Sequence, residues 1–210
     1  MAERPYLLLG TSNTHKAKEL RALLAGIPYE IVDLTQLDPL PEPVEDGDSF
    51  EANAMIKALA YAEASGLLTL ADDSGLEIDA LGGEPGVFSA RWSGVGMSYP
   101  DRFRLINRRL AGVPEAERTA RFRCVIALGA PPPRGLCGLT TGVVEGLIAH
   151  EPRGENGFGY DPIFLLPDRG LTMAELPEGQ KDMISHRAIA TLAARELLLR
   201  LAAEAHDGAE

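Results

Sequence analysis

The chain has 210 residues, carries a formal net charge of −11 and is 45% hydrophobic. This length and composition predict a globular chain with a buried core, and they exclude a disordered tail or a disulfide-stapled mini-protein. Its 31 acidic against 20 basic residues argue against nonspecific nucleic-acid binding, which needs a broad basic surface. Any phosphate group must therefore bind at a local site.

The cysteines and the apolar runs bear on the compartment. Cys124 and Cys137 have no CxxC spacing and no histidine cluster around them, so neither a disulfide framework nor a zinc site is indicated. The longest apolar run is far shorter than the roughly 18 residues that a membrane span needs. The beginning of the sequence lacks the basic flank and cleavage site of a signal peptide. We expect a cytoplasmic protein with no membrane partner and no nucleic-acid partner.

The first predicted elements are a strand over 6–10, a tight turn and a helix whose apolar residues recur at helical spacing. The connecting segment, GTSNTHK at 10–16, lies where free backbone N–H groups and the helix dipole favour an anion, and Lys16 adds a full positive charge. It is not a Walker A loop, because GxxxxGK[ST] is absent. An ordinary N-cap beside a solvated Lys16 is the alternative for this segment alone.

A second helix is predicted after a proline-bounded loop. Asp48 and Glu51 have the spacing of a capping box, and Gly66 is placed to end the helix. Just before it, Glu45 and Asp46 could supply a metal-binding oxygen, although this segment by itself favours a solvated acidic loop.

Two adjacent carboxylates follow the next apolar run. The run at 67–71 leads into Asp72 and Asp73 and then Gly75, after which a further strand is predicted, so the two acids are expected where a buried strand ends. Carboxylates at that position suit a hard cation such as Mg²⁺. Because adjacent strand residues point to opposite faces, only one can face a site, and the other is expected to be structural. A simple Asx turn before Gly75 remains the alternative.

The rest of the sequence alternates helices and strands with long glycine-rich loops. These elements are a loop over 82–97, a helix from Ser98 to about Leu110, antiparallel strands at 121–129 and 136–149, a loop at 154–162 and a last helix capped by Ser185. The mixture predicts an α/β fold, and a two-lobed form with a cleft is consistent with it.

Two late segments carry side chains suited to a nucleoside. Phe158 and Tyr160 flank a glycine and could present a ring on which a base stacks, although buried packing of Phe158 is the usual alternative. Lys181, His186 and Arg187 place two cations and an imidazole near the start of the last helix. A basic pair at a helix N-terminus is unfavourable to the helix, and functional sites tolerate such conflicts.

Together, TSNTHKAKEL, ADDSGLEIDALGGEPGVFSARWSG, GFGYDPIF and KDMISHR resemble, in order and spacing, the signature segments of the inosine triphosphate pyrophosphatase family. The resemblance covers nearly the whole chain, from Leu7 to the last helix. It implies one two-lobed domain over 1–210, with a long curved mixed β-sheet flanked by helices and a central cleft. It also implies a Mg²⁺-dependent homodimer that hydrolyses ITP, dITP and XTP to the monophosphate and pyrophosphate.

The resemblance assigns roles to matching positions. Asp73 corresponds to the proton acceptor and a metal ligand, and Glu45 to the second metal ligand. The implied substrate contacts are Thr11, Ser12, Asn13 and Lys16 at the triphosphate, with Thr14 and His15 in the same segment, Ser74 after the acid pair, Phe158, Gly159, Tyr160 and Asp161 at the nucleoside, and Lys181, His186 and Arg187 completing the base pocket. Ser49 and Asp182 depart from the family's common residues, and neither is implicated in the chemistry.

Two other functions are weighed against this one. A Maf-like nucleotide pyrophosphatase would resemble the fold and act on other triphosphates, but the DDSG and SHR segments argue against it. A nucleotide-binding module without catalytic activity is the second alternative, and the presence of Asp73 and Lys16 argues against it.

Overall fold

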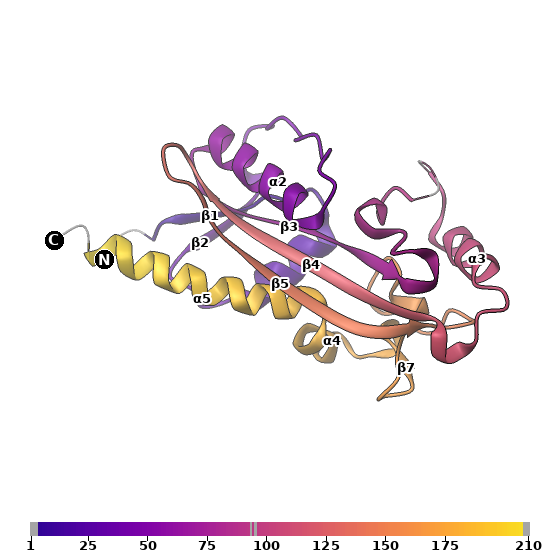
Figure 1. Ribbon diagram of the computed structural model, residues 1–210. Coiled ribbons are helices and arrows are strands. Elements are labelled where there is room, and N and C mark those ends of the chain that lie inside the picture. The colour runs from indigo at the N-terminus through magenta and orange to yellow at the C-terminus, as the bar shows by residue number, and fades with distance from the viewer. Residues whose placement is uncertain (1–3, 93, 95, 208–210) are drawn as a thin grey trace. The chain divides into compact units, whose positions relative to one another are not determined.

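The computed structural model describes residues 4–92, 94 and 96–207 (Figure 1). The chain divides into two compact units. The first unit holds the described residues up to Asp73, then Cys124–Gly142 and the chain from Arg187 onward. The second unit holds Ser74–Arg123 and Val143–His186. The prediction that 1–210 forms one two-lobed domain stays a prediction.

The described strands form a seven-stranded sheet in the order β2-β1-β3-β4-β5-β6-β7. Strand β1 pairs in parallel with β2 and β3, whereas β6 pairs antiparallel with β5 and β7, so the sheet is mixed. The strands are β1 (Tyr6–Leu9), β2 (Glu30–Asp33), β3 (Leu68–Ile78), β4 (Thr119–Ala130), β5 (Gly135–Ile148), β6 (Phe164–Leu166) and β7 (Leu171–Thr172). The predicted α/β fold with a mixed sheet is confirmed.

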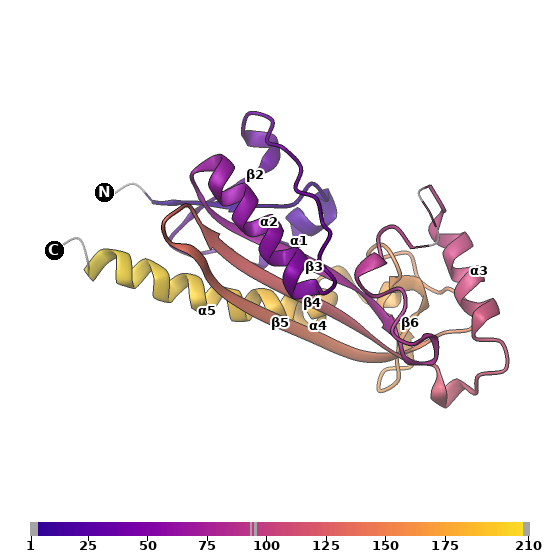
Figure 2. The same cartoon turned by 45° about the horizontal axis from the view of Figure 1, so that its top comes forward.

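In the first unit, helices cover both faces of the strands. Helices α1 (Thr14–Leu23) and α5 (His186–Asp207) pack with Leu7 and Leu9, whereas α2 (Phe50–Ser65) packs with Leu8 on the other face. This division follows from the alternation of side chains along β1. Figure 2 shows α2 and α5 on opposite sides of these strands. A Cβ at Gly129 of β4 would lie 2.8 Å from the backbone of Ala58, so glycine allows α2 to approach the sheet.

The second unit has its own core beneath α3 (Tyr99–Arg109), with α4 (Glu178–Ile184) late in its chain. Phe103 and Ile106 of α3 belong to this core together with Phe122 and Phe164, whose rings stack with centroids 4.2 Å apart. Aromatic stacking of this kind adds to the gain from burial. Trp92 and Tyr160 belong to the same core, so each of the two glycine-rich loops has one aromatic side chain anchored in it.

Two boundaries differ from the predictions. Asp72 and Asp73 were expected at the end of a strand, but β3 continues through them and through Gly75 to Ile78, and no Asx turn interrupts it. Leu76 and Ile78, which follow the two acids, are buried in the core of the second unit. This core is formed by segments distant in the sequence, so a local pattern does not reveal it. The cap of α2 is Ser49 rather than Asp48, because Ser49 Oγ accepts the Ala52 N–H at 3.2 Å.

Other predicted boundaries are confirmed. Ser98 caps α3, and Gly66 ends α2 with a left-handed φ of 72°. Helix α1 follows the predicted turn, and its N-cap is Asn13. Strands β4 and β5 are neighbours in the sheet and are joined by the short segment 131–134. In the described part of the chain, none of the helices is long and apolar enough to cross a membrane.

Candidate functional site

The segment between β1 and α1 forms the predicted strand, turn and helix. Asn13 Oδ1 accepts the backbone N–H groups of His15 at 3.0 Å and Lys16 at 3.2 Å, and Thr11 Oγ1 accepts the Asn13 N–H at 3.2 Å. The Asn13 side chain therefore acts as an N-cap. The side chains of Ser12, Thr14 and His15 are exposed. Their role at a triphosphate, with that of Thr11 and Asn13, stays a prediction.

Asp72 lies in a buried ion cluster on one face of β3. Its side chain is 0% exposed, and its Oδ2 lies 2.9 Å from Lys16 Nζ and 3.3 Å from Arg187 Nη2. Arg187 also reaches Glu19 Oε2 at 2.6 Å. Burial alone would raise the pKa of Asp72, but the positive charges of Lys16 and Arg187 hold that pKa well below its usual range. Asp72 is thus ionised and is paired with two cations through its Oδ2 atom.

Asp73 lies in a different cluster, with Asn53 and Lys57 of α2. Asn53 Nδ2 donates to Asp73 Oδ2 at 3.2 Å, and Lys57 Nζ lies 3.4 Å from Asp73 Oδ1 and 2.9 Å from Glu45 Oε2. Burial raises the pKa of Asp73 despite the nearby cations Lys57 and Lys16. A carboxylate of raised basicity, fixed by a side-chain amide, is suited to accept a proton.

Lys57 is a site residue that the sequence reasoning did not identify. Burial lowers its pKa, but Asp73, Asp72 and Glu45 more than offset that effect, and the pKa is raised. Lys57 is therefore a fixed positive charge between two carboxylates. One signal could have revealed it: Asn53 and Lys57 lie one turn apart on a helix otherwise rich in alanine, and polar residues on an apolar helix face invite a search for partners.

Glu45 and Asp73 supply the donors that a hard cation prefers. Both carboxylates contact the one Lys57 ammonium, at 2.9 and 3.4 Å, so their oxygens converge on a common point. Within the described residues there is no group of three or more His, Cys, Asp or Glu side chains that could hold a metal. Mg²⁺ commonly uses only one or two carboxylates and takes its other ligands from water and substrate phosphates. The residues present fit such an ion.

In the second unit, an ion pair between Asp161 and Lys181 stabilises the loop that carries Phe158. Asp161 Oδ2 accepts the Phe158 N–H at 2.8 Å and lies 2.8 Å from Lys181 Nζ, which lies 4.8 Å from the centre of the Phe158 ring. A Cβ at Gly157 would come within 2.1 Å of that Asp161 oxygen, and the φ of Gly157 is +75°, so this position needs glycine. Phe158 remains partly exposed, and a base could contact its ring.

Tyr160 supports this loop from inside. It is 4% exposed, its hydroxyl donates to the Ser89 carbonyl at 2.9 Å, and burial raises its pKa to about 12. Gly159 precedes it with a φ of +66°. His186 is also buried, and its ring stacks on Phe122 with centroids 4.7 Å apart. Ser74 follows Asp73 in β3 and is partly buried.

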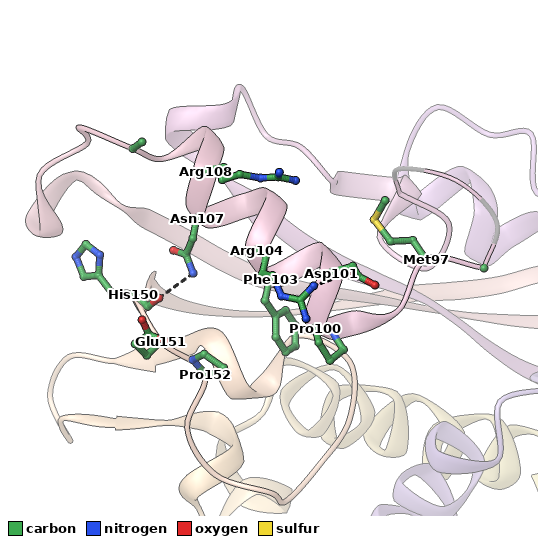
Figure 3. A pocket seen from close by; sticks show the side chains of 12 residues that line it. Met97, Pro100, Asp101, Phe103, Arg104, Asn107, Arg108, His150, Glu151 and Pro152 are labelled. Atoms are coloured by element: carbon green, nitrogen blue, oxygen red, sulfur yellow. Dashed lines mark hydrogen bonds and ion pairs between the residues drawn. The ribbon is translucent and has the colours of Figure 1, made fainter.

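A groove of about 1300 Å³ lies along α3 in the second unit (Figure 3). Arg104, Asn107 and Arg108 line it from the helix, opposite His150 and nearby residues. Asn107 Nδ2 donates to the His150 carbonyl at 2.9 Å, so this hydrogen bond joins two residues that line the groove. The groove contains none of the predicted site residues.

The predicted residues thus fall into two groups. The first unit holds Thr11, Ser12, Asn13, Thr14, His15, Lys16, Glu45, Asp73 and Arg187, whereas the second holds Ser74, Phe158, Gly159, Tyr160, Asp161, Lys181 and His186. Arg187 was expected to complete the base pocket with Lys181 and His186, and the structure adds that it is paired with Asp72 and Glu19. Its base-reading role stays a prediction, as do the roles of the others.

By its fold the chain is a mixed α/β protein, with acid–cation clusters in its first unit and an aromatic loop backed by a cation in its second. Comparison with known families specifies the class further. The model of the Ham1 family matches residues 7–197, and the chain belongs to this family.

Individual relatives agree with this assignment. A protein of Symbiobacterium thermophilum named dITP/XTP pyrophosphatase is 50% identical over 199 residues, covering 94% of this chain and 97% of the relative. One of the same name from Desulforamulus reducens is 47% identical over 195 residues, covering 93% and 96%. The structure of a HAM1 protein from Coxiella burnetii superposes with a TM-score of 0.85 at 39% identity, covering 93% of this chain and 99% of that one.

Proposed function

We propose that this chain is a nucleoside triphosphate pyrophosphatase that hydrolyses ITP, dITP and XTP to the monophosphate and pyrophosphate. Relatives that are 47–50% identical over more than nine-tenths of the chain are named dITP/XTP pyrophosphatase. The observation that carries the proposal is the Asp73 carboxylate, which is buried, held by Asn53 and placed beside Lys57. A binding module needs no such basic carboxylate, whereas a hydrolase needs one to activate water.

The reaction breaks the anhydride between the α- and β-phosphates. Catalysis therefore requires a water nucleophile and stabilisation of the charge that develops on the departing pyrophosphate. Asp73 accepts the proton of the attacking water, and Asn53 fixes the carboxylate in one orientation. Lys57 supplies a positive charge that is already in place before the transition state forms.

A divalent metal ion, Mg²⁺, belongs to this proposal. Glu45 and Asp73 are the residues that would hold it, and the bound ion would neutralise phosphate oxygens of the substrate. Their oxygens converge on Lys57, which indicates that a second cation could be accommodated at the same carboxylates.

The chain's net charge of −11 repels a triphosphate, so attraction must be local. We place this attraction at the start of α1, where the Lys16 ammonium, which is paired with Asp72, and the exposed Ser12, Thr14 and His15 side chains are the proposed contacts. Phe158, backed by Lys181, offers a ring face for the purine. The base-reading roles of His186 and Arg187 are proposed from the resemblance alone. The proposal places a homodimer in the cytoplasm, where the nucleotide pool is used.

The test is product analysis with purified protein, Mg²⁺ and ITP, XTP, GTP or ATP. We expect inosine monophosphate and pyrophosphate from ITP, with little turnover of ATP. Asp73→Asn is the matched inactive control, because it keeps the shape of the side chain and removes the proton acceptor. Release of inorganic phosphate and a diphosphate would contradict pyrophosphatase chemistry, and binding of ITP without turnover would favour a binding module.

A further inference from the structure

Arg102 of α3 is buried, and the described part of the chain gives it no carboxylate partner. It is 5% exposed, whereas Arg104 and Arg108 on the same helix are exposed and line the groove of Figure 3. Among the described residues, no ion pair joins Arg102 to an acidic side chain, and its Nε atom has no hydrogen-bond partner. A buried charge without a counter-ion is costly. Such a buried cation invites a search for a role beyond packing.

The side chains of Arg102 and Tyr160 donate to the same acceptor, the backbone carbonyl of Ser89. Arg102 Nη1 donates to the Ser89 carbonyl at 3.0 Å, and the Tyr160 hydroxyl donates to the same oxygen at 2.9 Å. The guanidinium lies 5.0 Å from the centre of the Tyr99 ring, which meets the Tyr160 ring edge to face at 5.3 Å. A cation over an aromatic face, together with a T-shaped aromatic pair, gives this arrangement a defined geometry.

Ser89 is a fixed anchor for both donors. Its Oγ accepts the Leu76 N–H of β3 at 2.9 Å and donates to the Gly86 carbonyl at 2.6 Å. These bonds fix the backbone at Ser89 relative to β3, so a side chain that donates to the Ser89 carbonyl is fixed relative to β3 as well. Tyr160 is one such side chain, and Phe158 and Asp161 are its neighbours in the sequence. The Asp161 carboxylate accepts the Phe158 N–H and pairs with Lys181.

We propose that Arg102 is a positioning residue for the nucleoside, holding Tyr160 and Ser89 so that the loop at 157–161 presents the Phe158 ring in one orientation. This inference rests on the proposed function, in which that loop contacts the nucleoside. Arg102 acts through Tyr160 and touches neither the phosphates nor the reacting water. Its removal should weaken binding of the nucleoside part of a ligand and leave binding of the phosphate part unchanged.

The experiment compares Arg102→Met, Arg102→Lys and Tyr160→Phe with Arg108→Met, an exposed arginine of the same helix, as the control. Binding of inosine monophosphate and of inorganic tripolyphosphate is measured by calorimetry, and kcat and KM are measured with ITP. For Arg102→Met we expect about ten-fold weaker inosine monophosphate binding and a KM raised by about the same factor, with kcat and tripolyphosphate affinity little changed. Arg102→Lys should restore part of the loss, because an ammonium can still donate to the Ser89 carbonyl.

The two side chains should also be coupled. Because Arg102 and Tyr160 share one acceptor, the effects of Arg102→Lys and Tyr160→Phe on inosine monophosphate binding should not add in the double variant. Equal losses for inosine monophosphate and tripolyphosphate, additive effects, or no loss in either single variant would overturn the proposal. If Arg102→Met does not fold, the two milder variants and their combination decide the question. Since binding is read without turnover, a protein that fails to hydrolyse ITP refutes the proposed function separately.

Discussion

The carboxylates of Asp72 and Asp73, neighbours in β3, belong to two separate ion clusters on opposite faces of the strand. Asp72 is paired with Lys16 and Arg187, and Asp73 contacts Asn53 and Lys57 of α2. The period of two along a strand makes this separation unavoidable. We therefore expect the two acids to have different functions, and the matched substitutions Asp72→Asn and Asp73→Asn distinguish them.

Asp73→Asn should abolish turnover while nucleotide binding persists. The amide keeps the shape of the side chain but cannot accept the proton of water, and loss of a general base costs on the order of 10²–10⁴-fold in rate. Steady-state pyrophosphate release and calorimetric binding of ITP measure the two properties. Turnover close to that of the unmodified chain would remove Asp73 from the mechanism.

Asp72→Asn should mainly lower stability. The substitution leaves Lys16 and Arg187 without their shared counter-ion in a buried position, and breaking a buried ion pair costs about 3–5 kcal/mol of the free energy of unfolding. Denaturant unfolding monitored by circular dichroism gives this value. A larger effect on kcat than Asp73→Asn causes, at unchanged stability, would reverse the division between the two acids.

The stability difference between the unmodified chain and Asp72→Asn should depend on pH. The pKa of Asp72 is lowered in the folded state, so its contribution is complete above the ordinary aspartate value of about 3.9 and is lost as the pH falls below it. Thermal unfolding from pH 7 down to pH 3 should show the two proteins converging at the acidic end. A difference that is constant over this range would show that the charge of Asp72 is not what stabilises the fold.

Activity should require a divalent metal ion, and Glu45→Gln should raise the Mg²⁺ concentration needed for half-maximal rate. Each carboxylate contributes to holding a cation that loses its water reluctantly. A Mg²⁺ titration of pyrophosphate release compares the two proteins, with Glu51→Gln, on the first turn of α2, as a control. Full activity in excess EDTA would exclude the metal requirement, whereas identical titrations would exclude only Glu45.

Turnover of ITP and XTP should greatly exceed that of ATP. A donor that meets the C6 oxygen of hypoxanthine or xanthine would face the amino group of adenine, and a site that leaves buried polar groups unpaired can reject a substrate by roughly 10⁴–10⁵-fold. The comparison is kcat/KM for ITP and ATP in the unmodified chain and in Arg187→Ala. Because Arg187 also pairs with Asp72 and Glu19, unfolding of the variant is measured in parallel. An equal loss of kcat/KM for ITP and ATP would show that Arg187 contacts a group that both nucleotides share, such as the ribose or a phosphate, and not the base.

Several features were predictable because their causes are local. A helix cap, a left-handed glycine and a helical spacing of apolar residues each depend on residues that are close together in the sequence. These signals located α1, α3 and the end of α2. The short strands β2, β6 and β7 were not predicted, since two to four residues carry little periodic signal and depend on a partner strand. Helix α4, with seven residues, has the same difficulty.

The sequence by itself determined the family, the mixed α/β character and the opposite orientation of Asp72 and Asp73, because motif spacing and strand alternation are properties of the chain. Only the tertiary structure decided which cations these acids meet. Lys57 joins Glu45 and Asp73 across segments separated by 12 and 16 residues, and Arg187 reaches Asp72 from 115 residues away. The same is true of Arg102, whose burial against Tyr160 depends on how α3 packs. Such contacts follow from the packing of whole elements, which no local pattern encodes.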